Sequence, residues 1–565
     1  MKLLVARRGL SLRLLCGVGA LLCGWGCARA QQPAPEPRRP DVLLSSTAGG
    51  SKTVAPDRPP PAPLPPPTPQ QRAARLRERV LEELAAPEMA RTRSSVLVLP
   101  VAGGDSLVSV EPDALRVPAS NAKLLTSLAA LRTLPGKYRF VTEYYLRGGK
   151  LYIWGTGDPA LRRRELASLG AQLRAHGVNA VRGIVIDDSF FDRRRRLAPG
   201  FESFGEGAYY RPTSGALNVN GNAITVKVSA PRKGRKRPRV DVYPPSDYVK
   251  VHKLVRFAPR KGKGAGKKRI SVQIRPRGAI MWVTVSGTIV RGHRPWRTRR
   301  AVYDPGLATG WAVRRALVKA GVKVSGNVWR GRRPRGATPV LRRVRSLGAI
   351  LAAVNTHSDN LAAESLVRAM GSLDATYGQR AGSWERGLLV LQRSLEQAGL
   401  SGFWLGNGSG LHRHSWVTAH LMTDLLRKVH SDEKLRQVLL PTLSVAGRSG
   451  TLAKRMRGTA AEGVVMGKTG TLGGALALSG YADPDGTSPL VFSILINGRS
   501  DRAVRHHIDR IAVLLARHAR GLPLASEPAS QPASQPASQP ATQPASQPAS
   551  QPTEEEEEVE DADER

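Results

Sequence analysis

The chain has 565 residues and a formal net charge of +43, with 87 Lys and Arg against 44 Asp and Glu. This length exceeds that of an ordinary single domain, so several folded units are expected. All three cysteines, Cys16, Cys23 and Cys27, lie near the N-terminus, which excludes a disulfide framework or a thiolate site from the rest of the chain.

The first 30 residues have the features of a secretory signal. Arginines precede an apolar stretch, and the letters ARA, which end at Ala30, form a small-x-small cleavage site. The apolar stretch is too short to favour a stable membrane span. We therefore predict a signal peptide over residues 1–30 and a periplasmic protein. Lipid attachment at Cys27 is less favoured, because the bulky Trp25 lies where small residues are preferred.

Two terminal segments have compositions that cannot build a hydrophobic core. Residues 31–71 are rich in proline and are expected to form a stiff tether. Residues 523–565 hold a PASQ repeat followed by an acidic tail. We expect both segments to be disordered, which places the folded part between them.

The folded part begins and ends with a mixture of helix and strand signals. Residues 71–85 have the apolar spacing of a helix, and residues 94–110 contain two β-type runs around a Gly-Gly-Asp turn, which predict a hairpin. Residues 473–498 predict two strands joined by an Asp-Pro-Asp-Gly turn, and residues 501–519 predict a closing helix.

The middle of the chain, residues 140–340, is rich in Gly and Arg and has mostly β-type signals. A segment of about 200 residues cannot be a loop, so we predict an insertion of one or two domains. The expected fold class is therefore α/β or α+β, with one core formed by residues 72–139 and 341–522 and split by that insertion.

Two basic runs lie in this insertion, RKGRKRPR at 232–239 and RKGKGAGKKR at 260–269. In a cytosolic protein they would indicate a nucleic-acid partner, but no nucleic acid is expected here, because the runs lack aromatic residues that stack on bases. Export redirects the interpretation towards anionic envelope polymers or lipid headgroups on a membrane. Solvated basic loops without a partner are the alternative that stays open.

Ser120 and Lys123 open a stretch whose leucines recur at helical spacing. Residues three apart lie on one helix face, so the amine can approach the hydroxyl. A serine hydroxyl becomes a nucleophile when a base removes its proton, and an ordinary lysine is protonated at neutral pH. Lowering its pKa to near 7 takes roughly 4 to 5 kcal/mol, which burial or a second cation can supply. The pattern S-x-x-K is common by chance in so basic a chain, so it needs support elsewhere.

Two further motifs supply that support, SDN at 358–360 and KTG at 468–470. Together with S-x-x-K, and in this order, they are a signature of penicillin-recognising serine enzymes. Ser358 can pass a proton from Lys123 to a leaving nitrogen, while Asn360 can hydrogen-bond a substrate amide and Lys123 together. Lys468 brings a second ammonium, which would lower the pKa of Lys123 and attract a terminal carboxylate.

The strand that carries K-T-G is expected to hold the substrate. Gly470 would let a peptide backbone lie against the strand edge, and the hydroxyls of Thr469 and Thr471 can bind a carboxylate. The backbone N–H groups of Thr471 and Ser120 are candidates for an oxyanion hole. These parts predict an acyl-transfer site for a peptide with a free terminal carboxylate.

The chain resembles the class C low-molecular-mass penicillin-binding proteins, the D-alanyl-D-alanine carboxypeptidase/endopeptidase family. Besides the motifs, the resemblance rests on the 238 residues from Ser120 to Ser358, where the family carries inserted domains, and on segments such as GTGDPAL, GIVIDDSFF and GNGSGLHRHSWVT. It implies a transpeptidase-like core in which an antiparallel sheet is flanked by helices. It also implies a serine DD-peptidase without cofactor or metal, which acts on peptidoglycan peptides and is inhibited by β-lactam antibiotics.

The resemblance also implies a role for each site residue. The nucleophile is Ser120, the base is Lys123, the proton relay and substrate holder are Ser358 and Asn360, and the carboxylate and oxyanion contacts are Lys468, Thr469 and Thr471. Asp187 and Arg413 take the places that shape the family's pocket for the peptide side chain. Asn407, His412 and Gly473 depart from the family pattern, which puts the side-chain preference in doubt.

Two alternative functions stay open. A β-lactamase-like hydrolase would share the first steps, but the E-x-x-L-N pattern of class A enzymes is absent between Asn360 and Lys468. A non-catalytic envelope protein that binds polymer with a penicillin-fold core would suit the basic runs, although the intact motifs argue against it. A metal hydrolase is disfavoured, because the eleven histidines include no H-E-x-x-H helix.

Overall fold

The computed structural model describes residues 67–524, except 194–195, 203–206, 232, 235, 260–267 and 375–380. The predicted signal peptide, most of the predicted tether and the tail from residue 525 lie outside the described residues, as does most of the second basic run. Within the described part, no helix is both long and apolar enough to cross a membrane.

A six-stranded antiparallel sheet forms the centre of the core, in the order β16-β17-β18-β19-β1-β2. The predicted hairpin is β1 with β2, and the predicted C-terminal strand pair is β18 with β19. The strand bounds are β1 Arg93–Pro100, β2 Val108–Val110, β16 Ser444–Val445, β17 Val465–Leu472, β18 Ala475–Ala482 and β19 Leu490–Asn497.

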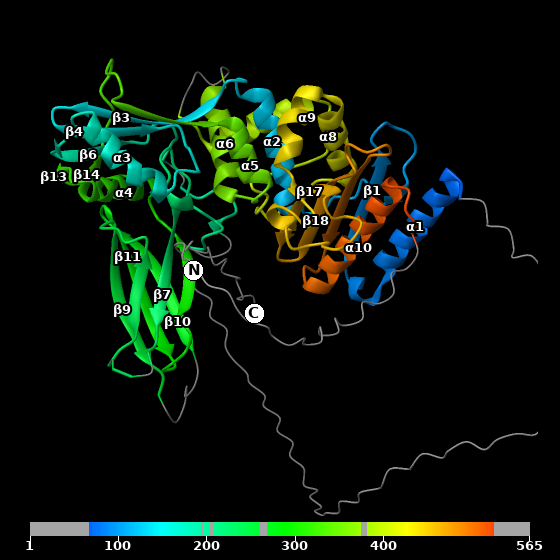
Figure 1. Cartoon of the computed structure of the whole chain (residues 1–565), viewed down its shortest axis with the longest axis horizontal. Coiled ribbons are helices and arrows are strands. Elements are labelled where there is room, and N and C mark those ends of the chain that lie inside the picture. Colours follow the sequence, from blue (N-terminus) through cyan, green and yellow to red (C-terminus); the bar gives the residue numbers. More distant parts are fainter. Residues whose placement is uncertain are drawn as a thin grey trace, which may run out of the picture. The chain divides into compact units, whose positions relative to one another are not determined.

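Helices cover both faces of this sheet (Figure 1), which confirms the predicted core. The two helices on one face are α1 Pro69–Ala85 and α10 Arg502–Ala519. The helices on the other face are α2 Ala122–Thr133, α5 Leu347–Asn355, α6 Asn360–Leu373, α7 Trp384–Glu396, α8 Ala419–Ser431 and α9 Glu433–Leu439. Because both faces are covered, every residue of β18 and β19 is buried.

The insertion begins with a second sheet, of five strands, in the order β14-β6-β4-β3-β15. Its strands are β3 Arg139–Arg147, β4 Lys150–Gly155, β6 Gly183–Asp187, β14 Val328–Arg330 and β15 Leu341–Ser346, and its helices are α3 Arg163–Ala175 and α4 Pro305–Lys319. Two short strands of the insertion, β5 Ala180–Val181 and β13 Lys323–Val324, form a separate parallel pair. Because β15 pairs along its whole length with β3, the core resumes at Leu347, and the boundary predicted at residue 341 was wrong by six residues.

The rest of the insertion is a β-sandwich. Two three-stranded sheets, β12-β7-β8 and β10-β11-β9, contribute their inner faces to one apolar cluster. We call this part, residues 223–301, the sandwich lobe (Figure 1, lower left). Its strands are β7 Ala223–Ser229, β8 Arg239–Tyr243, β9 Val249–Phe257, β10 Arg269–Arg277, β11 Ile280–Ile289 and β12 Trp296–Ala301.

Candidate active site

Ser120 lies in a short 3-10 turn, Ala119–Asn121, that leads directly into α2. Ala119, the residue before it, has a φ of 45°, which is costly for a residue with a side chain and persists only where the surroundings enforce it. Two glycines press against this turn. A Cβ on Gly410 would lie 1.9 Å from the Ala119 carbonyl oxygen, and one on Gly470 would lie 2.8 Å from that of Pro118. The nucleophile is therefore held between β17 and the segment of Gly410.

Lys123 lies one turn into α2, fully buried beneath Ser120. Its Nζ lies 2.9 Å from Ser120 Oγ and 2.6 Å from Asn360 Oδ1, and it donates to the carbonyl oxygen of Ser409 at 2.8 Å. The spacing of S-x-x-K thus places the amine within hydrogen-bond distance of the hydroxyl, as predicted from the helix geometry.

Burial is the main cause that lowers the pKa of Lys123, to about 7, while the charges of Glu364 and Asp359 oppose this shift. Of the two causes expected from the sequence, burial and the second cation Lys468, burial is the one that acts on Lys123. Repulsion between the two amines acts on Lys468 instead. Burial is the larger cause and the charge of Lys123 the smaller one, and together they lower the pKa of Lys468 well below its usual value. At neutral pH a sizeable fraction of Lys123 is therefore uncharged and can accept a proton.

The SDN motif is organised by a helix cap. Asp359 is the N-cap of α6 and accepts a hydrogen bond from the backbone N–H of Ala362 at 3.0 Å. Ser358 has a positive φ of 55° and accepts from Lys468 Nζ at 2.9 Å, so the relay from Ser358 to Lys123 stays a prediction. Asn360 uses its Nδ2 to donate to the carbonyl oxygen of Tyr210, which belongs to the insertion.

Strand β17 presents an open edge next to Ser120. The short β16 pairs with residues 466 and 467 alone, so residues 468–472 have β18 on one side and no described strand on the other. Thr471 is exposed on this edge, whereas the hydroxyl of the largely buried Thr469 donates to Thr451 at 2.7 Å. A Cβ on Gly470 would lie 2.8 Å from the carbonyl oxygen of Pro118, so this face of the strand is closed by the turn of Ser120. The role of Gly470 towards a substrate backbone at the strand edge stays a prediction.

A cleft of about 320 Å³ opens over these groups. The predicted site residues in its walls are Ser120, Ser358, Asn360, Arg413 and Thr471. The other residues that line it are Tyr210, Arg211, Leu411, Leu472, Gly473 and Ser500. Arg413 lies in the cleft as predicted and donates to the Gly473 carbonyl oxygen at 3.2 Å. Tyr210 and Arg211 come from the insertion, and no local pattern in the sequence indicated them.

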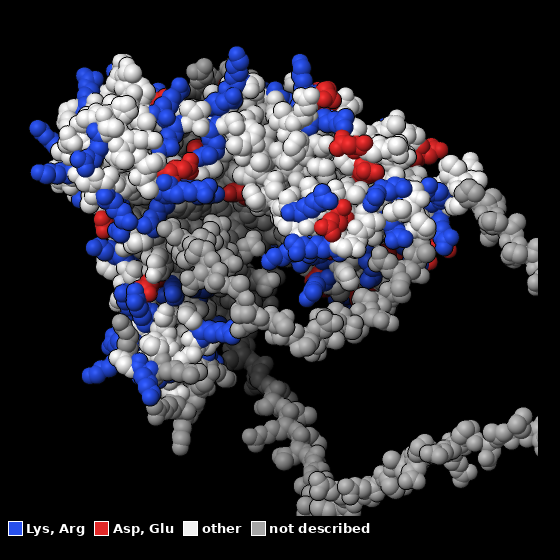
Figure 2. Space-filling view, viewed as in Figure 1, with Lys and Arg blue, Asp and Glu red and all other residues white. Residues whose placement is uncertain are grey.

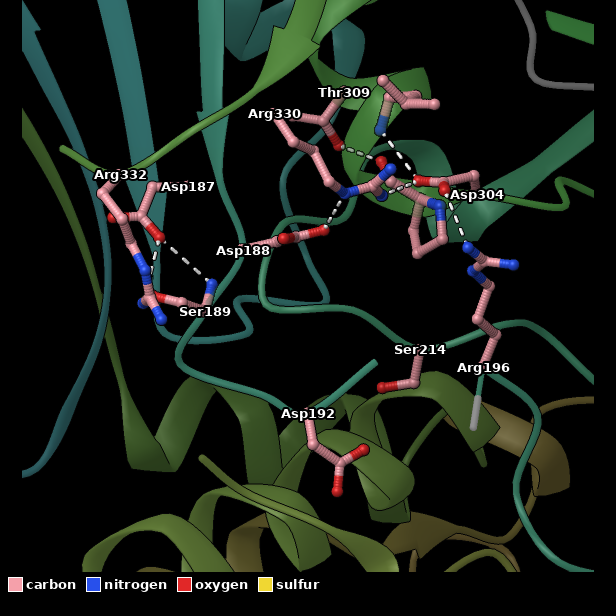
Figure 3. Close-up of polar contacts among 12 residues, drawn as sticks. Asp187, Asp188, Ser189, Asp192, Arg196, Ser214, Asp304, Thr309, Arg330 and Arg332 are labelled. Atoms are coloured by element: carbon pink, nitrogen blue, oxygen red, sulfur yellow. Dashed lines mark hydrogen bonds and ion pairs between the residues drawn. The ribbon is translucent and has the colours of Figure 1, made fainter. Parts of the chain in front are cut away.

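Asp187 does not line this cleft. It ends β6, and its carboxylate accepts from the backbone N–H of Arg333 at 2.8 Å. It also accepts from the backbone N–H of Ser189 at 3.2 Å (Figure 3). The Arg332 guanidinium lies 3.9 Å away, and the side chain of Asp187 is only 4% exposed. The carboxylate is occupied within the insertion, so the role in side-chain recognition predicted for Asp187 has no support in these contacts.

Glu364 is a functional candidate that the sequence analysis did not identify. It lies on α6 one turn after Asn360, fully buried, and accepts from the backbone N–H of Ser409 at 2.9 Å and from Trp384 Nε1 at 2.8 Å. Because the carbonyl oxygen of Ser409 in turn accepts from Lys123, the carboxylate fixes the residue that orients the amine. Its position four residues after Asn360 was the available signal, since that spacing shares a helix face.

Comparison with known proteins identifies relatives along nearly the whole folded part. The family model described as D-Ala-D-Ala carboxypeptidase 3 (S13) matches residues 76–518. A D-alanyl-D-alanine carboxypeptidase of Actinomadura sp. (strain R39) is 34% identical over 523 residues, covering 86% of this chain and 94% of the relative. The carboxypeptidase DacB of Haemophilus influenzae is 26% identical over 68% of this chain and 80% of its own length.

The fold also has a counterpart among solved structures. Penicillin binding protein 4 (dacB) of Haemophilus influenzae superposes with a TM-score of 0.65 at 22% identity, over 77% of this chain and 97% of that one. The same protein complexed with a β-lactam gives a TM-score of 0.62. The similarity extends over about three quarters of this chain, and it confirms the predicted fold class.

Proposed function

The chain belongs to the D-Ala-D-Ala carboxypeptidase 3 (S13) family, and from this premise we propose that the Ser120 cleft is the active site of a serine DD-peptidase acting on peptidoglycan peptides. The observation that carries the proposal is the contact of 2.9 Å between Ser120 Oγ and the fully buried amine of Lys123. A buried amine with a pKa of about 7 is a competent base for a serine hydroxyl.

Acylation begins when Ser120 Oγ attacks the carbonyl carbon of the penultimate D-alanine. Lys123 takes the hydroxyl proton, and the backbone N–H groups of Ser120 and Thr471 stabilise the developing oxyanion. The peptide bond then breaks, and the amine of the terminal D-alanine leaves with a proton that returns from Lys123, with Ser358 as the relay. Water hydrolyses the ester on Ser120 and releases the shortened peptide.

The cations of the cleft select a substrate with a free carboxylate. Arg211 and Arg413 line the cleft, and the amine of Lys468 lies against Ser358 at its base. A carboxylate bound there stabilises the ammonium form of Lys468, and that charge in turn disfavours a second ammonium at Lys123. Substrate binding therefore favours the state in which Lys123 is the base.

The open edge of β17 suits an extended peptide that adds to the sheet as a further strand. The same groups serve carboxypeptidase cleavage, which releases D-alanine, and endopeptidase cleavage of D-Ala crosslinks, which releases a longer chain. We propose that both occur. A β-lactam reacts at the same serine, because its ring presents a strained amide beside a carboxylate.

Digestion of purified peptidoglycan fragments tests this function. We expect mass spectra to show loss of one terminal alanine from monomeric pentapeptides and a fall in crosslinked dimers. The matched control is Ser120→Ala, which should leave both unchanged because it removes the nucleophile. Loss of dimers without loss of alanine would restrict the enzyme to crosslinks, whereas activity retained in Ser120→Ala would refute the assigned nucleophile.

Replacement of Glu364 by glutamine should shift the pH dependence of acylation. The Glu364 carboxylate favours the ammonium form of Lys123, so its loss lowers the pKa of that amine further. We expect the acylation rate of a fluorescent penicillin to reach half of its plateau at a lower pH than in the wild type. Trp384→Phe is the matched control, because it removes one donor to Glu364 without changing the charge. An unchanged midpoint in Glu364→Gln would contradict the role of the carboxylate.

A class A β-lactamase would need a glutamate that activates the deacylating water, and Glu364 is not placed for this role. Glu364 lies near the catalytic residues, and its carboxylate is fully buried and accepts hydrogen bonds from backbone and indole N–H groups. It is turned away from the cleft and towards Gly408 and Ser409. The acyl-enzyme formed with penicillin is therefore expected to be long-lived, and the antibiotic acts as an inhibitor.

We further propose that the protein is exported to the periplasm, where its substrate lies. The support is the predicted signal peptide over residues 1–30, which lies outside the described residues.

A further inference from the structure

The sandwich lobe holds a disproportionate share of the positive charge. Residues 223–301 contain 23 Lys and Arg against two carboxylates, Asp241 and Asp247, which is about half of the net charge of +43. The core segments 72–139 and 341–522 contain 34 Lys and Arg against 20 Asp and Glu, over roughly three times the length. The excess is therefore local to one lobe and is not a uniform property of the chain. Figure 2 shows Lys and Arg side chains spread over the visible face of this lobe with little acidic surface.

One sheet of the lobe presents a cationic surface. In the β10-β11-β9 sheet alternate residues point away from the sandwich core, and we call their surface the outer face. Its residues are exposed or half-buried: Lys250, His252, Leu254 and Arg256 on β9, Ile280, Trp282, Thr284, Ser286 and Thr288 on β11, and Arg269, Ser271, Gln273, Arg275 and Arg277 on β10.

Strand register places four cations at the corners of this face. Lys250 and Arg275 share one row with Trp282 between them, and Arg256 and Arg269 share another. The rows lie six residues apart, so the corners span roughly 20 Å along the strands and about 10 Å across them. The residues between the corners carry mostly hydroxyl, imidazole or amide groups and no carboxylate.

These corner cations have no partner among the described residues. No ion pair or hydrogen bond joins the side chains of Lys250, Arg256, Arg269 or Arg275 to another described residue. The five-stranded sheet of the insertion behaves differently, because there Arg345 pairs with both Asp158 and Glu165. Fixed cations that lack internal counterions attract external anions, most strongly at low salt.

We propose that the outer face binds a flexible polymer that carries repeated phosphates on a hydroxylated backbone. Three of its four corner cations are arginines, whose guanidinium groups match phosphate oxygens in paired hydrogen bonds. The hydroxyl and amide groups between them match the hydroxyls of a polyol or glycan chain. The surface holds the enzyme near such a polymer, apart from the Ser120 cleft and independently of its chemistry.

Two other classes of partner fit the face less well. A bilayer would need an apolar stripe to insert, and the aliphatic side chains on this face are Leu254, 46% exposed, and the half-buried Ile280 at the start of β11. A single-stranded nucleic acid would need aromatic rings on which bases stack, and the one ring here, Trp282, has the Arg277 guanidinium 5.0 Å from its centroid.

Binding of the full chain to poly(glycerol phosphate), measured by calorimetry over a range of NaCl concentrations, tests the proposal. The variant with Lys250, Arg256, Arg269 and Arg275 all changed to glutamine should bind at least about tenfold more weakly at low salt, with a log K against log salt slope about three units shallower. Its penicillin acylation rate should be unchanged, because the outer face lies apart from the Ser120 cleft, and an unchanged circular dichroism spectrum shows that the lobe is folded.

The matched control changes four exposed cations of the core, Arg75, Arg77, Lys434 and Arg502, to glutamine and so removes the same charge. We expect this control to keep wild-type affinity. Equal loss in both variants would overturn the proposal in favour of net charge alone. Tighter binding to duplex DNA or to anionic phospholipid vesicles than to the polymer would overturn the choice of partner.

Discussion

Replacement of Lys123 by methionine is expected to lower the second-order rate constant of penicillin acylation by about 10³-fold or more. The amine is the base for Ser120, and its 2.9 Å contact leaves no room for a water molecule to take its place. Methionine fills a similar volume, so the loss is chemical rather than a cavity effect. The measurement is stopped-flow or gel-based labelling with a fluorescent penicillin.

The stability of Lys123→Met shows whether its loss of acylation comes from the missing base or from unfolding. Removing a fully buried amine relieves its desolvation, while the acceptors on Asn360 and Ser409 lose a donor, at a cost of roughly 1–3 kcal/mol. These effects oppose each other, so Lys123→Met should unfold cooperatively, with a free energy of unfolding close to that of the wild type. Lys434→Met, on the exposed side of α9, serves as the control with wild-type acylation. Acylation by Lys123→Met within tenfold of the wild type would show that another group acts as the base.

The sequence predicted the catalytic residues because they lie in three short motifs. Spacing of three residues fixed the approach of Lys123 to Ser120, and the order of the three motifs indicated the fold of the core. The structure adds why SDN has its shape, since Asp359 caps α6 and leaves Ser358 in a positive-φ conformation beside Lys468.

Residues whose roles depend on distant parts of the chain escaped prediction. Tyr210 and Arg211 reach the cleft from the insertion, and no pattern near them identifies that contact. Asp187 matched the resemblance by position but is bound within its own domain. The contribution of Lys468 to the low pKa of Lys123 was also misjudged, because the sequence named burial as a cause but could not show that the amine is fully buried.

The insertion contributes to the active site as well as to the predicted surface. Arg368, on the same helix face as Asn360 and Glu364, is fully buried and donates to the carbonyl oxygen of Ser214 at 2.7 Å. Its guanidinium also lies 4.4 Å from the ring centroid of Phe191. Helix α6 therefore binds the loop of the insertion that supplies Tyr210 to the cleft. This contact holds the insertion's part of the site in place against the core's part.

The central claim is that burial keeps Lys123 uncharged near neutral pH, and the pH dependence of acylation tests it most directly. Below a pKa of about 7 the amine is an ammonium without a lone pair, so each unit of falling pH should lower the acylation rate about tenfold, to roughly a hundredth at pH 5. Above about pH 7 the rate should level off. A rate that is flat from pH 5 to 9, or one that keeps rising towards pH 10, would contradict the account.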